Sequence, residues 1–305
     1  MNTKYQLLTI LGATASGKTG VATHAALAFD GEIISGDSRQ VYRGMDLGTG
    51  KDIDEYTING TPIPYHLIDI EDAGAEYNVF RFQEDFHEAF ADISKRGKLP
   101  ILCGGSGMYL ESVLNNYELS HVPKHEELRE ELKEKSLEEL GDILRSYKTV
   151  HNNSDLETKR RAIRAIEIEE FMRQHPNAEK EKQSISSLVV GVLFDRETRR
   201  KRISTRLQQR IDEGMIEEVR TLLNSGIKPE QLIYYGLEYK YLTQHVIGEL
   251  SFDEMYSQLE IAIHQFAKRQ MTWFRRMEKH GTQIHWLDGN MPMEEKMEAI
   301  RVMGL

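Results

Sequence analysis

The sequence predicts an α/β fold with a doubly wound parallel sheet and a helical insertion. Short runs rich in Ile, Leu and Val alternate with longer amphipathic segments, as expected when strands are buried on both faces and joined by helices. A glycine-rich turn follows the first run, at residues 12–19, and no strand pattern occurs between residues 115 and 187. We therefore expect the binding site at the carboxyl edge of the sheet.

Strands are predicted where apolar runs are bounded by turn residues, over 7–11, 32–35, 66–70, 99–103, 188–194 and 283–287. Helices are predicted where apolar residues recur at helical spacing, over 18–29, 79–96, 108–114, 126–147, 156–173, 197–223, 252–279 and 292–303. We expect residues 1–114 and 188–305 to form a P-loop core, with residues 115–187 as the helical insertion.

The composition is typical of a globular protein without a disordered tail: of 305 residues, 39% are hydrophobic, 29% are charged and seven are proline. No apolar run approaches the ~18 residues of a membrane helix, and the first residues lack the layout of a signal peptide. We expect no membrane segment and a cytoplasmic location. The lone Cys103 cannot form an internal disulfide, which suits a reducing compartment.

The net charge of -10 argues against binding of nucleic acid by the average surface. Basic clusters nevertheless occur at residues 159–164, 199–202 and 268–276, and the last one interleaves cations with aromatic residues. Each cluster alone is typical of a solvated helix face, but three of them in an acidic chain favour a groove for a polyanion.

The glycine-rich turn reads G-A-T-A-S-G-K-T and comprises Gly12, Ala13, Thr14, Ala15, Ser16, Gly17, Lys18 and Thr19. It follows a strand and opens a helix, which is the context that a phosphate-binding loop requires. The glycines let backbone N–H groups close around phosphate oxygens, Lys18 neutralises their charge, and the Thr19 hydroxyl can hold Mg²⁺. The loop predicts a phosphorylated ligand but not its identity.

Polar residues follow two further strands. Asp37, in the segment 35–51, can accept a proton, bind magnesium or simply form a turn. The segment 102–109, L-C-G-G-S-G-M-Y, turns from strand to helix and presents the Ser106 hydroxyl to the same edge. Because this strand ends in Gly-Gly-Ser and not in a Walker-B aspartate, the pattern does not favour ATP hydrolysis.

Taken in order, these segments resemble the tRNA dimethylallyltransferases. The matching blocks are G-A-T-A-S-G-K-T, D-S-R-Q-V-Y-R-G-M-D-L-G-T-G-K, G-G-S-G-M-Y, R-I-D-E-G-M-I-E-E-V-R at 210–220 and A-K-R-Q-M-T-W-F-R at 267–275. The chain departs from the family pattern at Ser106, where Thr is usual, at Gly236-Leu237-Glu238, at His264, and in a shorter insertion. The resemblance implies that the phosphate loop holds the diphosphate of dimethylallyl diphosphate in place of ATP.

The resemblance also implies the reaction, transfer of the dimethylallyl group to N6 of the adenosine that follows the anticodon in tRNA. Lys18, Arg210 and Mg²⁺ on Thr19 would stabilise the leaving diphosphate, Asp37 would accept the proton, and Ser106 would bind the reacting region. The implied partners are dimethylallyl diphosphate and the anticodon stem-loop of tRNA, with the protein acting as a monomer. The implied tRNA-contacting positions are Asp37, Ser38, Arg39, Gln40, Ser106, Arg129, Arg160, Arg161, Ala162, Ile163 and Arg164.

Two other functions stay open at this point. Serine after the two glycines is also similar to the adenylate isopentenyltransferases, which act on free nucleotides. A P-loop small-molecule kinase or NTP-driven regulator would use the same phosphate loop.

Overall fold

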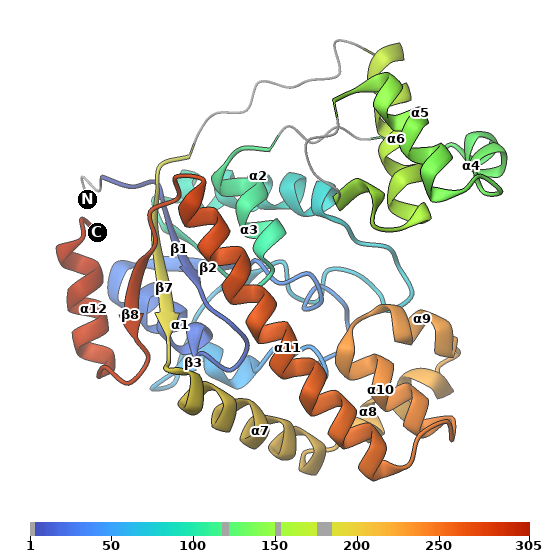
Figure 1. Ribbon diagram of the computed structural model, residues 1–305. Helices are drawn as coiled ribbons and strands as arrows, with labels where there is room; N and C mark the ends of the chain where they lie inside the picture. Colours follow the sequence, from blue (N-terminus) through green and yellow to red (C-terminus); the bar gives the residue numbers. More distant parts are fainter. Residues whose placement is uncertain (1–3, 118–121, 150–153, 176–184) are drawn as a thin grey trace. The chain divides into compact units, whose positions relative to one another are not determined.

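The computed structural model describes residues 4–117, 122–149, 154–175 and 185–305, and its helices and strands are labelled in Figure 1. Six parallel strands form one sheet in the order β5-β2-β6-β1-β7-β8. Their bounds are β1 Leu7–Leu11, β2 Gly31–Ser35, β5 Tyr65–His66, β6 Leu99–Gly104, β7 Ser187–Leu193 and β8 His285–Asp288. The predicted α/β fold is confirmed.

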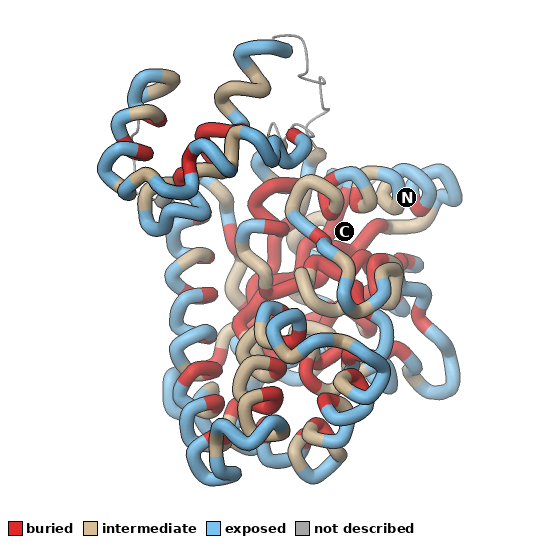
Figure 2. The backbone as a smooth tube through the Cα atoms, turned by 90° about the vertical axis from the view of Figure 1, so that its right-hand side faces the viewer, coloured by how far each residue is buried: buried red, intermediate tan, exposed pale blue. Residues whose placement is uncertain are grey.

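Alternate residues of the strands enter two hydrophobic cores, one on each face of the sheet. Leu7 and Leu11 of β1 belong to the core that also contains buried residues of α2 (Val79–Lys95), α3 (Gly107–Leu114) and α11 (Phe252–Lys279). Leu8 and Ile10 belong to the core formed with α1 (Lys18–Phe29) and α12 (Met293–Val302). Figure 2 shows the buried residues concentrated in the middle of this part of the chain. The strands are apolar throughout because both faces are covered.

Further helices lie beyond β7. The helix α7 (Arg196–Asp212) contacts α11, while α10 (Leu237–Val246) packs against α8 (Met215–Asn224) and α9 (Pro229–Tyr234). A short 3-10 helix, η1 (Ile53–Tyr56), precedes a small hairpin of β3 (Thr57–Ile58) and β4 (Thr61–Pro62).

Residues 118–183 form a compact unit separate from the unit of residues 1–117 and 184–305. Its described part contains α4 (Glu126–Leu132), α5 (Leu137–Tyr147), the 3-10 helix η2 (Ser154–Leu156) and α6 (Lys159–Gln174). Leu132, Leu140, Leu144, Ala162 and Ile166 form its small core.

Two predicted long helices are wrong, because each is divided in two. The segment 126–147 ends its first helix at Leu132 and restarts after Ser136, whose side chain forms a capping box with Glu139. The segment 197–223 is interrupted at Gly214, where φ is +102° and the chain leaves the helical conformation.

The predicted strand at residues 66–70 is also wrong over most of its length. Only Tyr65 and His66 pair with β2, because Leu67 and Asp69 adopt positive φ values of 61° and 55°. The helices α9 and α10 and the β3–β4 hairpin were not predicted.

Candidate active site

The phosphate-loop segment connects β1 to α1 as predicted. Gly17 adopts a left-handed conformation with φ of +74° directly before α1, so the loop turns there into the helix. A Cβ atom on Gly12 would lie 2.4 Å from the Ser16 Oγ atom and 3.1 Å from the Val192 carbonyl oxygen, so a side chain at this position would crowd the loop. The first turn of α1 therefore presents its backbone N–H groups and the side chains of Lys18 and Thr19 to one cavity.

The carboxyl ends of β2 and β6 meet beside this loop. The Ser38 N–H donates to the Ser106 hydroxyl over 3.2 Å, which ties the segment after β2 to the segment after β6. Buried Gln270 of α11 joins the other pair of loops: the Thr14 N–H donates to its Oε1 over 2.9 Å, and its Nε2 donates to the Gly105 carbonyl over 2.9 Å. Three separate strand ends thus share one fixed arrangement.

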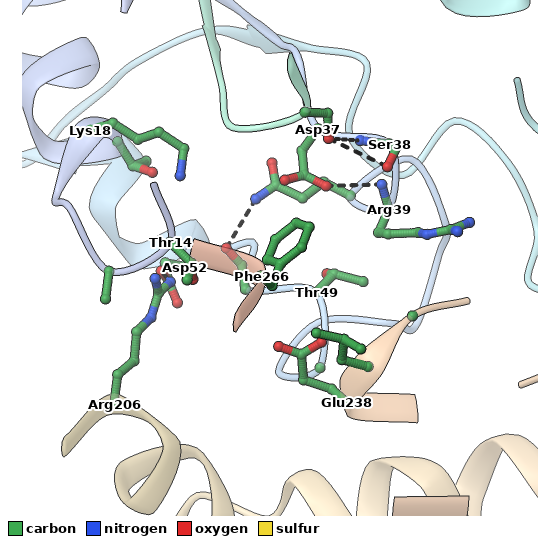
Figure 3. A pocket seen from close by; sticks show the side chains of 18 of the residues that line it. Thr14, Lys18, Asp37, Ser38, Arg39, Thr49, Asp52, Arg206, Glu238 and Phe266 are labelled. Carbon is green, nitrogen blue, oxygen red and sulfur yellow. Dashed lines mark hydrogen bonds and ion pairs between the residues drawn. The ribbon is translucent and has the colours of Figure 1, made fainter. Parts of the chain in front are cut away.

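These loops surround a cavity of about 250 Å³. Figure 3 shows Lys18 and Arg206 on one side of it, Asp37, Ser38 and Arg39 on another, and Phe266 between them. One oxygen of the Asp37 carboxylate accepts the Arg39 N–H over 2.9 Å, and within the described residues nothing else bonds to this carboxylate. Asp37 is therefore held in place and keeps an oxygen available to a ligand.

The cations of the cavity are crowded and partly compensated. Burial lowers the pKa of Lys18, against the opposing effect of Asp37 and Asp52. The Asp52 carboxylate accepts hydrogen bonds from Arg206 and, over 3.1 Å, from Arg210. Glycine at position 50 makes room for this pair, because a Cβ there would lie 2.2 Å from the Arg210 guanidinium. Lys18, Arg206 and Arg210 thus all line one cavity beside the phosphate loop, and Asp52 binds the two arginines.

The loop that carries Asp52 is itself held by charged side chains. The Glu218 carboxylate of α8 accepts the N–H groups of Asp46, Leu47 and Gly48 over 2.9, 2.7 and 3.1 Å. The fully buried Lys51 ammonium binds the Asp46 carboxylate over 2.6 Å and also the Asp69 carboxylate. A loop with its backbone groups bonded in this way holds Asp52 and Arg210 at fixed positions.

Most of the predicted site residues lie together. The cavity is lined by Thr14 to Thr19, Asp37 to Gln40, Ser106 and Arg210, with Gly12 and Ala13 directly before this run. The remaining predicted residues, Arg129 and Arg160 to Arg164, belong to the unit of residues 118–183.

Within that unit, the residues predicted to contact RNA differ in their surroundings. Arg129 forms a two-pronged ion pair with buried Glu167, over 2.5 and 2.7 Å, and Arg164 binds Glu167 over 3.0 Å. Ala162 is buried in the core, whereas Arg160 and Arg161 are exposed. Arg129 and Arg164 therefore have a structural partner in addition to any RNA contact.

Residues 40–277 match the model of the IPP transferase family. The chain is 61% identical over 293 residues to tRNA dimethylallyltransferase 1 of Parabacteroides distasonis, which covers 96% of this chain and 95% of the relative. It is 60% identical over 297 residues to tRNA dimethylallyltransferase 2 of Bacteroides fragilis, covering 97% of each chain. The chain belongs to the IPP transferase family.

Solved structures of this family share the fold. The full-length tRNA isopentenylpyrophosphate transferase of Bacillus halodurans superposes with a TM-score of 0.72 at 30% identity, over 98% of this chain and 95% of that one. A eukaryotic dimethylallyltransferase described as acting on tRNA gives a TM-score of 0.79 at 21% identity, over 98% of this chain and 78% of that one. No helix among the described residues of this IPP transferase is long and apolar enough to cross a membrane.

Several residues that line the cavity were absent from the sequence-based site: Thr49, Gly50, Asp52, Glu55, Arg206, Tyr235, Glu238, Phe266 and Gln270. Two of them had a usable signal. Arg206 lies one helical turn before Arg210, and Gln270 lies inside the block A-K-R-Q-M-T-W-F-R. Burial raises the pKa of Glu238. This residue lies on the unpredicted helix α10, so no local sequence pattern could indicate that it lies near the phosphate loop.

From the ion pairs of Glu167 with Arg129 and Arg164 we predict how pH affects the stability of the unit of residues 118–183. Burial alone would raise the pKa of Glu167, but hydrogen bonds from Arg129, the His125 N–H and Arg164 lower it to about 2, below its usual value of 4.5. Its stabilising effect is therefore complete above about pH 4.5 and is lost as the pH falls towards 2. Glu167→Gln should lower the free energy of unfolding at pH 7 by about 1.5 to 3 kcal/mol.

Hydrogen exchange of the α6 amides, corrected for intrinsic rates, measures both effects. Wild-type protection should fall between pH 4.5 and pH 2, and Glu167→Gln should flatten this dependence. Exposed Glu127 of α4 provides the control variant, Glu127→Gln, which should behave as wild type. Equal acid sensitivity in wild type and Glu167→Gln would contradict the assigned role of the pair.

Proposed function

We propose that the protein transfers a dimethylallyl group from dimethylallyl diphosphate to N6 of the adenosine that follows the anticodon in tRNA, with release of diphosphate. One observation carries the proposal: a single cavity places a phosphate loop with three cations opposite a carboxylate that has an available oxygen. Family membership and the names of relatives about 60% identical support the same reaction.

The leaving group would bind at the phosphate loop. An allylic C–O bond breaks readily once the negative charge that develops on diphosphate is stabilised. The backbone N–H groups at the start of α1, the Lys18 ammonium and the guanidinium groups of Arg206 and Arg210 supply that stabilisation. Arg206 joins the sequence-based set because it lines the same cavity as Lys18 and Arg210.

Magnesium fits this arrangement through the Thr19 hydroxyl, which lines the cavity. No group of three or more His, Cys, Asp and Glu side chains able to hold a metal occurs among the residues that the structure describes. A magnesium ion would therefore take most of its oxygen ligands from diphosphate and water, and it would add positive charge at the leaving group.

The adenosine amine would react on the Asp37 side. The N6 atom forms a bond to the allylic C1 carbon while the bond from C1 to the diphosphate oxygen breaks, and the Asp37 carboxylate takes the N6 proton. Asp37 also orients the amine, because its second oxygen is fixed by the Arg39 N–H. Ser106, anchored to the Ser38 backbone, limits the positions open to the base.

The RNA would reach the cavity with the target base flipped out of its stack. The unit of residues 118–183 presents Arg160 and Arg161 on its surface, and we assign to it the contact with the anticodon stem. A tRNA substrate implies activity in the cytoplasm; the monomeric state stays a prediction.

The choice between RNA and free nucleotide has a direct test. An anticodon stem-loop with adenosine after the anticodon should be prenylated, and AMP or ADP should react negligibly, in assays with labelled dimethylallyl diphosphate. RNA binding should weaken as salt rises, because each neutralised phosphate releases counterions. Efficient labelling of AMP without labelling of RNA would favour the adenylate-type alternative, and phosphoryl transfer from ATP would favour a kinase.

Removing a leaving-group cation should slow turnover. Lys18→Ala, Arg206→Ala and Arg210→Ala should each lower kcat at least tenfold and weaken binding of the diphosphate substrate, a loss of about 2 to 4 kcal/mol by analogy with an oxyanion donor. Arg220→Ala, which removes an exposed arginine paired with Glu217 on α8, is the matched control and should retain wild-type turnover. Wild-type kcat in a cavity variant would remove that residue from the leaving-group role.

Asp37→Asn should separate binding from chemistry. The amide keeps the shape of the side chain but cannot accept the proton, so kcat should fall by roughly 10² while the Kd for dimethylallyl diphosphate changes little. Asp54→Asn, at an exposed position of η1, serves as the control. Full activity of Asp37→Asn with an unchanged pH profile would contradict the assignment of Asp37 as the base.

A further inference from the structure

An exposed aromatic side chain borders the cavity on the Asp37 side. Tyr234 ends α9 and is 50% exposed, although most tyrosine rings in the described residues are largely covered. The three residues that follow it, Tyr235, Gly236 and Leu237, all line the cavity. An exposed aromatic ring has an apolar face in contact with water, and this ring adjoins residues that line the cavity.

Arg39 connects this ring to the catalytic turn. Its backbone N–H donates to Asp37, and its guanidinium donates to the Tyr234 carbonyl over 3.3 Å. The guanidinium carbon lies 5.5 Å from the centroid of the Tyr234 ring and 5.9 Å from that of Tyr235. The Arg39 guanidinium therefore lies over the exposed Tyr234 ring, and the Arg39 backbone belongs to the turn that holds Asp37.

The support beneath Tyr234 is rigid. The Tyr235 hydroxyl accepts the Gly74 N–H over 2.6 Å and donates to the Ala75 carbonyl over 3.0 Å. Buried Tyr42 packs edge-on against the Tyr235 ring, with centroids 4.5 Å apart. Because its neighbour is anchored by two hydrogen bonds and a ring contact, Tyr234 can offer its face to a ligand at little conformational cost.

The chemistry of this surface matches an unpaired nucleobase. Proteins bind unstacked bases of RNA on aromatic rings and on guanidinium planes, with about 1 to 3 kcal/mol per stacked base. When the target adenosine leaves the stack, the base beside it loses a stacking partner. We propose that Tyr234 and Arg39 form a stacking platform for the base next to the target adenosine. The proposal rests on the proposed function, because it requires an RNA substrate with a flipped adenosine.

The test combines protein variants with altered RNA. Tyr234→Ala should raise the Kd for the anticodon stem-loop about 5-fold to 160-fold, the range that corresponds to loss of one stacked base. Tyr234→Phe, which keeps the ring, should bind as wild type. Phe252→Ala is the matched control, because Phe252 is 43% exposed but neither it nor its neighbours in the chain line the cavity. The slope of log Kd against log salt should be the same for Tyr234→Ala and wild type, since stacking releases no counterions.

Two further stem-loops, each abasic at one neighbour of the target adenosine, identify the stacked base. Wild type and Tyr234→Ala should bind one of these two RNAs equally, because that RNA lacks the base that stacks on the Tyr234 ring. If Tyr234→Ala lost the same affinity for all three RNAs, or changed the slope of log Kd against log salt, the stacking platform would be overturned and Tyr234 would instead contact the RNA backbone. Wild-type binding by Tyr234→Ala would overturn it as well. Failure of the wild-type enzyme to prenylate the unmodified stem-loop would instead contradict the proposed function.

Discussion

The close approach of three strand ends is the constraint on which the rest of the site depends. A Cβ atom on Gly104 would lie 2.4 Å from the Gly36 carbonyl, and one on Gly105 would lie 2.6 Å from the Gln270 amide nitrogen. Because Gly36, Gly104 and Gly105 have no side chains, the segments after β1, β2 and β6 can converge. Gln270 then joins two of these segments by hydrogen bonds. The distance between the phosphate loop and Asp37 is set by this backbone packing, and not by flexible side chains.

Charge balance within the cavity follows from that packing. Lys18, Arg206 and Arg210 are brought together where desolvation disfavours the charged lysine, and Asp52 compensates the two arginines. A diphosphate bound beside Lys18 would favour the charged form of this lysine. The same burial that lowers the Lys18 pKa would make its interaction with a bound diphosphate stronger than it would be in water.

Local sequence signals predicted the parts of the fold that depend on local chemistry. The helices α1 and α11 lie within the predicted bounds, and the phosphate loop follows β1. The break at Ser136 was missed although Ser136 and Glu139 form a recognisable capping box, because a continuous charged pattern favoured one helix. Asp52 and Glu238 could not be predicted, since each reaches the cavity only through tertiary packing of α7, α8 and α10. Likewise, the sequence shows Arg129 and Arg164 as cations but does not show that buried Glu167 binds both.

The central claim is that one cavity holds diphosphate and the target adenosine at the same time. A crystal structure of the protein with inorganic diphosphate and an anticodon stem-loop tests it most directly. We expect diphosphate oxygens bonded to the backbone N–H groups of the loop 12–19, and the flipped adenine with its N6 within hydrogen-bond distance of the Asp37 carboxylate. An adenosine that remains stacked in the RNA, or a diphosphate bound away from Lys18, would contradict it.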